Sequence, residues 1–343
     1  MLSRVAFISA AALGTLLLAG CLKTDRPAPE QNAICFQAGS LLLRDDATKS
    51  GIPKETFTNG DKFFVYGTKV VDQERLPIFN GDAVRYTGTT IWDYSPVRLW
   101  DSHASRYDFI AFSGPDSNAG ISCTIPNNIH ANLSARVTYD ATGTQCDLMA
   151  ACYHRSDGTV TPVDFAFRHM LSAVSVVIYN DSPLQDITLN SYRFRYLCTR
   201  ATAFVEQDIN EPVIPEDWSS PSYNTNLVLG SSTGADLAHS GSCFPASAAY
   251  DLMIPQELDR LGAYIPRLVV DYSYDPGPGV ENVVTTIRLQ DIKVKNSEEL
   301  ITRWLPGVKY NYEIHIRVGG GIRVVVSTTD WEDVYAETPG LAI

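Results

Sequence analysis

Side-chain polarity with a period of two is the feature that most constrains this chain. From Lys309 to Val318, apolar or aromatic residues alternate strictly with polar ones. The same alternation, or a run of β-branched and aromatic residues, recurs at 61–67, 106–112, 169–180, 267–274, 291–295 and 321–331. Such segments predict β-strands, most of them with one buried face.

Helical patterns are scarce. Residues 296–304 predict one short helix, with Asn296 as its cap and Glu299 completing a capping box, before Pro306 and Gly307 end it. Strands and helices do not alternate, and no repeat of fixed period occurs. With turns rich in Gly, Pro, Asn and Asp, the sequence predicts an all-β fold of two tandem antiparallel β-sandwich domains, of Greek-key or transthyretin-like type.

The domain boundary is expected near residues 154–162, where a polar, turn-rich stretch separates two strand-rich halves. The predicted domains are an N-terminal β-sandwich over 33–160 and a C-terminal β-sandwich over 161–343, which ends in a further strand segment. Hydrophobic residues are 45% of the chain and aromatic residues 10%, so both halves can form a core.

The N-terminus has the order of an export signal. Arg4 is followed by 16 residues without charge, Val5–Gly20, which is short of the roughly 20 that cross a bilayer core. The ending Leu18-Ala19-Gly20-Cys21 resembles a bacterial lipobox, which implies a signal peptide over 1–20 and fatty-acyl (palmitate-type) modification of Cys21. Residues 21–32 then predict a lipidated flexible tether. Leu22 favours the outer membrane, and the alternative is an ordinary signal peptide with a chance cysteine.

Net charge and cysteine content bear on nucleic-acid binding, disulfide bonds and zinc binding. A net charge of -12 argues against binding of nucleic acid, whose phosphates would be repelled. Besides Cys21, six cysteines remain, and in an exported chain they allow 15 disulfide pairings that the sequence leaves open. No Cys or His spacing is typical of a zinc site.

Few residues suggest catalysis or ligand binding. Residues 230–234 fit G-x-S-x-G around Ser232, yet the strand-turn-helix context of a nucleophile elbow is missing. Asp116, Ser117 and Asn118 could offer oxygens to calcium, although a plain turn is the simpler interpretation. Trp92 and Trp100 are candidate aromatics for binding a sugar, with core packing as the alternative. The sequence thus predicts no catalytic residue, no metal site and no cofactor.

A series of segments, taken in order, resembles the fimbrillin family of Bacteroidales, the type V pilins. The most specific is 84–115, with W-x-Y-x-P, a further Trp and then Y-x-F-x-A before a Gly-Pro turn. The others are 57–67, 147–151, 165–180, 252–257, 304–316 and 327–334. Together they span nearly the whole chain after the tether.

The resemblance implies a structural subunit of a surface fimbria, acting in adhesion and held to the outer membrane by lipid. Its partners would be other fimbrial subunits and a host or bacterial surface ligand. In the family, a protease cuts after an arginine beyond the first strand, that strand leaves, and a terminal strand of the next subunit replaces it. On this sequence the leaving strand corresponds to 33–43, the cleavage site to Arg44 or, second, Arg75, and the donor to residues after Trp331.

Three alternatives stay open. The chain could be a stalk, tip or anchor subunit. It could be a surface glycan-binding lipoprotein that uses exposed aromatics such as Trp92 and Trp100. Less favoured is a lipid-anchored hydrolase with Ser232 as nucleophile.

The lipid anchor predicts a clear fractionation result. Replacement Cys21→Ala removes the thiol that acyl transfer requires, so the variant is expected in the soluble periplasmic fraction while the parent protein stays with membranes. Immunoblotting of the two fractions measures this. Recovery of the variant in the membrane fraction would reject lipid anchoring.

Overall fold

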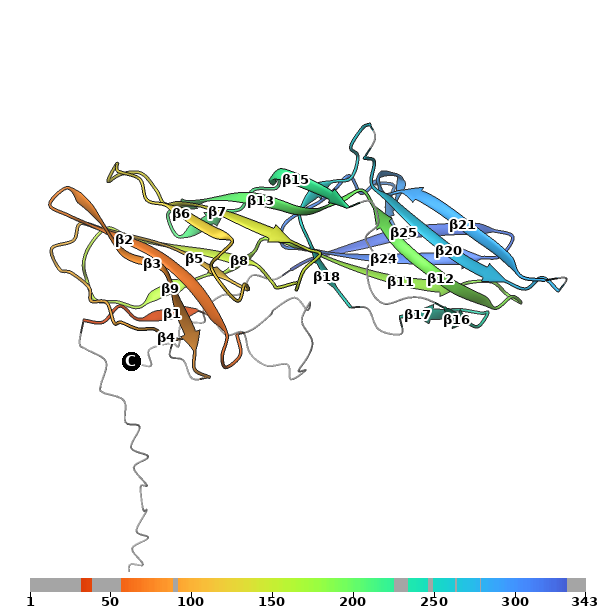
Figure 1. Cartoon of the computed structure of the whole chain (residues 1–343), viewed down its shortest axis with the longest axis horizontal. Coiled ribbons are helices and arrows are strands. Elements are labelled where there is room, and N and C mark those ends of the chain that lie inside the picture. The colour runs from red at the N-terminus through yellow and green to blue at the C-terminus, as the bar shows by residue number, and fades with distance from the viewer. Residues whose placement is uncertain are drawn as a thin grey trace, which may run out of the picture. The chain divides into compact units, whose positions relative to one another are not determined.

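The computed structural model describes residues 32–38, 57–88, 92–224, 234–245, 249–262, 264–277 and 279–331 (Figure 1). Their regular secondary structure is β-strand, and the single helical element among them is the 3₁₀ turn η1 (Leu289–Asp291). The predicted all-β sandwich class is therefore confirmed. None of the described segments forms a helix with the length and apolar character that crossing a membrane requires.

The first large sheet is buried on both faces. Its six strands, in spatial order, are β10 (Arg168–His169), β8 (Met149–Arg155), β5 (Arg106–Ser113), β2 (Lys62–Val71), β3 (Glu74–Tyr86) and β4 (Trp92–Asp93). In β5, Tyr107 through Ser113 are all buried, which is why Phe109 to Phe112 form a continuous apolar run instead of an alternating one. Phe109 belongs to one core cluster and Ile110 to the other.

Two different layers cover those faces. The Ile110 side packs with a sheet of β14 (Glu211–Val213), β13 (Leu197–Asp208), β7 (Ser134–Asp140) and β6 (Ile121–Thr124), with β15 (Ser219–Asn224) also paired to β13. The Phe109 side packs with a two-stranded parallel sheet of β1 (Phe36–Ala38) and β9 (Val163–Phe165). The short β1–β9 sheet thus covers a face made largely of aromatic side chains.

The second sandwich has two principal sheets. One contains β17 (Ser242–Phe244), β11 (Ser172–Asn180), β24 (Val308–Arg317), β25 (Gly321–Asp330) and β22 (Lys293–Val294), with β18 (Asp251–Met253) also paired to β11. The other contains β16 (Ala235–Leu237), β12 (Ile187–Arg195), β20 (Arg267–Tyr274) and β21 (Glu281–Arg288). A separate pair joins β19 (Gln256–Glu257) to β23 (Arg303–Trp304). In β24 the apolar positions of the predicted alternation are buried: Tyr310, Tyr312, Ile314 and Ile316.

Local details differ from the sequence-based expectations. Antiparallel pairs predominate, but β1–β9, β11–β24 and β22–β25 are parallel. The predicted helix over 296–304 is wrong. Asn296 has φ of 61°, outside the helical region, and Trp304 is fully buried, with Nε1 donating to the Tyr312 hydroxyl at 2.9 Å. Burial of the indole in an extended segment outweighs the weak local helix signal.

The chain crosses between the two sandwiches more than once, and one of these passages spans a single residue. Strand β12 ends at Arg195, Tyr196 has φ of 63°, and β13 begins at Leu197 in a different sheet. Seven consecutive residues of β13 then pair with β7, from Arg200 opposite Asp140 to Glu206 opposite Ser134. The boundary at residues 160–161 stays a prediction, and strand pairing crosses it.

A partly buried carboxyl, that of Asp251, lies where the loop before β8 meets β18. The Leu252 N–H donates to Oε1 of Gln145 at 2.7 Å, and Tyr139 donates from its hydroxyl to the Leu252 carbonyl at 3.4 Å. Burial raises the pKa of Asp251 to about 6, although a hydrogen bond with Gln145 opposes the change. At neutral pH the folded protein therefore holds an ionised carboxyl that burial disfavours.

The raised pKa of Asp251 predicts that removal of its carboxylate charge stabilises the protein at neutral pH and not at acid pH. Because its folded-state pKa exceeds the unfolded value, the carboxyl favours folding below about pH 4, and this contribution is lost as pH rises to 6. Replacement Asp251→Asn is thus expected to raise the free energy of unfolding by on the order of 2 kcal/mol at pH 7.5 and to have little effect at pH 4. Urea unfolding at both pH values measures it, with exposed Asp259→Asn as the control. An equal effect at both pH values would contradict this assignment.

Candidate functional site: the cradle of the N-terminal segment

The N-terminal segment, defined as residues 32–38, lies as an extended chain on the first large sheet. Its side chains alternate, with Ile34 and Phe36 buried and Cys35 exposed. This is the period of two that an extended backbone imposes on a segment with one covered face. Its two large apolar side chains therefore point into the protein.

Hydrogen bonds to its main-chain N–H and C=O groups hold the segment on both sides. On one side, the Ile34 N–H donates to the Arg98 carbonyl at 2.9 Å, and the hydroxyl of Tyr94 donates to the Ile34 carbonyl at 2.7 Å. On the other side, the Val163 N–H donates to the Cys35 carbonyl at 2.8 Å. The segment is thus bonded as an inserted strand between two neighbours, although it belongs to no large sheet.

An aromatic pocket receives Phe36. Its ring stacks on Phe165 at a centroid distance of 5.7 Å and an interplanar angle of 9°. Further rings surround it at 5.4 to 6.2 Å: Phe63, Phe79, Tyr94 and Phe109. Edge-to-face and offset contacts of this kind add to the free energy of apolar burial. Phe36 is accordingly the side chain that secures the segment in its cradle.

No disulfide ties the segment to the rest of the described chain. The thiol of Cys35 is free and exposed, and the five other described cysteines are also free: Cys123, Cys146, Cys152, Cys198 and Cys243. The segment is therefore held by hydrogen bonds and packing, both of which are reversible.

The two candidate sugar-binding tryptophans lie in the core. Trp92 and Trp100 are each 5% exposed. Trp92 packs on Phe57 and Phe63, and Trp100 contacts Tyr107 at 4.6 Å. Neither indole presents a face to solvent, so the structure gives no support to a binding platform made from these two residues.

Of the two candidate cleavage sites, Arg75 lies within the described residues and Arg44 does not. Arg75 is in β3 with its side chain 2% exposed. Its guanidinium donates to Asp108 at 3.0 Å and to the carbonyls of Ile129 and Ala131 at 2.8 and 2.7 Å. A protease would have to unfold β3 to reach this residue. Arg44 lies outside the described residues, as do Cys21, Ser232 and the donor candidate after Trp331.

The charged cluster around Asp108 was not foreseen from the sequence. Arg106 donates from Nε to Asp108 Oδ2 at 2.6 Å, and His154 Nδ1 lies 2.8 Å from Oδ1. Burial raises the pKa of Asp108, but the bonds from His154 and Arg106 prevail and hold it below its ordinary value. With Arg75, this cluster fixes the 129–131 loop against the sheet, which is a structural role.

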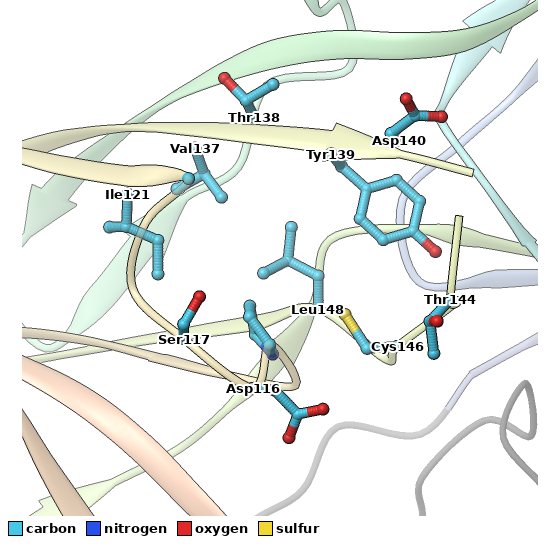
Figure 2. Close-up of a pocket in the computed structure, with 12 residues that line it drawn as sticks. Asp116, Ser117, Ile121, Val137, Thr138, Tyr139, Asp140, Thr144, Cys146 and Leu148 are labelled. Atoms are coloured by element: carbon cyan, nitrogen blue, oxygen red, sulfur yellow. The ribbon is translucent and has the colours of Figure 1, made fainter. Parts of the chain in front are cut away.

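A hollow of about 290 Å³ lies beside β7 (Figure 2). The Tyr139 ring, the Cys146 thiol and Leu148 line it, with Asp116 and Ser117 on the facing loop. Burial raises the pKa of Cys146 to about 11, so the thiol is protonated at neutral pH and is a weak nucleophile. Among the described residues, no group of three or more His, Cys, Asp or Glu side chains is placed to hold a metal ion.

Comparison with known proteins gives one family and several related folds. The sequence profile of the family described as Fimbrillin-like matches residues 48–331. A solved protein assigned to cell adhesion from Parabacteroides distasonis ATCC 8503 has a TM-score of 0.50 and 8% identity, covering 89% of this chain and 98% of that one. Its likeness shows a shared fold.

Two further solved structures match with lower TM-scores. A cell adhesion protein from Bacteroides uniformis ATCC 8492 has a TM-score of 0.46 and 17% identity, covering 88% of this chain and 99% of that one. A fimbrial protein from Bacteroides ovatus ATCC 8483 has a TM-score of 0.33 and 13% identity, covering 84% and 49%. No curated protein matches the sequence.

The cradle predicts a specific effect of emptying its pocket. Replacement Phe36→Ala removes the ring from five aromatic contacts and should lower stability by about 3 to 5 kcal/mol if the segment unfolds with the domain. If the segment unfolds by itself, the same loss appears as faster hydrogen exchange confined to residues 33–38 and 163–165. Exchange measured by mass spectrometry separates these cases, with Gln37→Ala as the matched control. Unchanged exchange and stability would show that Phe36 does not secure the segment.

Proposed function

Because the chain belongs to the fimbrillin-like family, we propose that it is a structural subunit of a surface fimbria, exported as a lipoprotein and assembled by strand donation. The family implies a location at the cell surface and assembly with other fimbrial subunits. The finer steps below are proposed from this chain's own residues, and the bonding of the N-terminal segment is the observation that carries them.

The N-terminal segment is suited to leave. It lies at the start of the described chain and is joined to its cradle without a disulfide. Cleavage after Arg44 would separate residues 21–44 from the remainder, so the segment could dissociate once its hydrogen bonds and the Phe36 contacts break. Arg75 is the weaker candidate because its side chain is buried and bonded within β3.

Departure of the segment would expose unpaired main-chain groups and apolar side chains in the cradle. The Val163 N–H and the Arg98 carbonyl would lose their main-chain partners, and the rings around Phe36 would face water. Unpaired polar groups and exposed apolar pockets both raise the free energy of the cleaved subunit. An extended strand with apolar residues at alternate positions would satisfy both, which is the physical basis for strand donation.

The donor is proposed to be the segment after Trp331, with sequence EDVYAETPGLAI. The residue that precedes it, Trp331, is firmly held. Trp331 is 3% exposed, its ring stacks on His169 at 3.8 Å, and its main-chain N–H donates to the Gly307 carbonyl at 2.7 Å. Pro339 and Gly340 limit the part that can pair as a regular strand. A fixed base at Trp331 followed by a short C-terminal segment fits transfer to an adjacent subunit.

Acylated Cys21 would hold the uncleaved protein at the outer membrane. A subunit that keeps residues 21–44 remains anchored with its own cradle filled, whereas a cleaved subunit can enter a filament. Stalk, tip and anchor roles therefore differ in whether the cut takes place. The proposed role is structural and not enzymatic, which follows from membership of the fimbrillin-like family.

Cleavage is expected to convert monomer into polymer. Treatment of the purified mature chain with an arginine-specific protease should give a new N-terminus at Asp45 and ladders on gels run after mild heating. Arg44→Ala should block both, and Arg75→Ala should leave the cut at Arg44 in place. Mass spectrometry identifies the new terminus. Monomer that persists at high concentration after confirmed cleavage would contradict strand donation.

A further inference from the structure

Strand β21 is the terminal strand of its sheet and has one unpaired edge among the described residues. It pairs with β20 along its whole length, from Glu281 opposite Tyr274 to Arg288 opposite Arg267. In the described sheets it has no second neighbour. Half of its main-chain N–H and C=O groups therefore point away from the protein as a row of free donors and acceptors.

Strand β21 is the longest terminal strand in the described sheets. The short β4 leaves most of β3 open as well, and that stretch of β3 contains Pro77. Nearly all the other terminal strands have two to four residues. The exception is β15, with six residues, and it contains Pro221 and two shifts of register. Strand β21 has eight residues, regular register, and neither proline nor lysine. Proteins usually block such an edge unless something pairs with it.

The side chains of β21 are mostly β-branched, as is typical of a strand that has neighbours on both sides in a sheet. Its core reads Val-Val-Thr-Thr-Ile, all β-branched, with Val283 and Ile287 half-buried on one face. On the other face Val284 is 61% exposed. Exposed β-branched residues on a regular unpaired edge favour addition of another strand.

We propose that β21 pairs antiparallel with β21 of a second copy of this chain, joining two four-stranded sheets into one. Geometry restricts how this can occur. Outward-pointing residues alternate along the strand, so two opposed residues must both be odd-numbered or both even-numbered. A two-fold axis near the middle of the strand is then centred on Val284 or on Thr285.

Side-chain complementarity supports a second copy as the occupant. With the axis at Thr285, Val283 lies opposite Ile287 of the other copy, and Asn282 lies opposite Arg288. Apolar β-branched pairs are favourable across strands, and no like charges oppose each other. Parallel pairing would instead place Glu281 beside Glu281 and Arg288 beside Arg288. The strand is thus self-complementary in one direction only.

This contact is independent of strand donation, since neither the N-terminal segment nor the residues after Trp331 takes part. It is a contact between equivalent faces and closes with two copies. Along a fimbria, each subunit would present one such edge, and weak pairs repeated along two filaments would add to firm side-by-side association.

Cysteine cross-linking tests the register. In the mature chain with Cys21→Ala and Cys35→Ala, which removes the exposed thiol of the N-terminal segment, Thr285→Cys or Val284→Cys should form a disulfide-linked dimer under mild oxidation. Residues on the axis meet at about 5 Å. Asn282→Cys on the same strand is the matched control, since its two copies lie far apart in either register. Equal cross-linking of all three, or of none, would overturn the proposal.

Lysine substitution tests the association itself. Val284→Lys places a charge on the exposed face beside the axis, and sedimentation equilibrium should show that it abolishes a dimer formed by the parent chain. Leu184→Lys, at an 82% exposed loop position, makes the same charge change and should leave the dimer intact. Thermal melts check that both variants are folded. A parent chain that stays monomeric at the highest concentration, or a Val284→Lys variant that still dimerises, would overturn the proposal.

Discussion

Burial of the first large sheet on both faces is the constraint on which the rest of the structure depends. One face packs on β7 and β13, and the other packs under the β1–β9 sheet. A sheet with two apolar faces cannot tolerate exposure of either, so something must cover the aromatic residues around Phe109. In this chain that cover is small and comes in part from residues near the N-terminus, which is why a short segment can matter so much.

The cover is well bonded yet separable. Main-chain and hydroxyl hydrogen bonds and the Phe36 pocket hold residues 32–38, while no disulfide within the described chain does so. The same contacts that stabilise the segment define what a replacement strand must offer: apolar side chains at alternate positions and a backbone free to pair on both sides. Stability before cleavage and affinity for a donor afterwards thus arise from one set of contacts.

The cradle and the edge of β21 differ in what occupies them. The cradle is filled within a single chain, whereas the edge of β21 is regular, long and open in the described chain. The other terminal strands are shorter, and the longest of them, β15, contains Pro221. This distribution separates two contacts between copies, one that would join subunits end to end after cleavage and one that would join them side by side through β21.

The sequence by itself determined the all-β class and most strands, because a period of two in polarity survives any tertiary context that buries one face, as in β24. It also led to the fimbrillin-like family. Only the tertiary structure decided that Trp92 and Trp100 lie in the core, that Arg75 is bonded to Asp108, and that Trp304 is in a strand and not a helix. Aromatic residues and arginines have the same local pattern whether buried or exposed. Long-range pairings such as β13 with β7, or Phe36 with Phe165, bring together residues that no local pattern relates, so they exist only once the chain is folded.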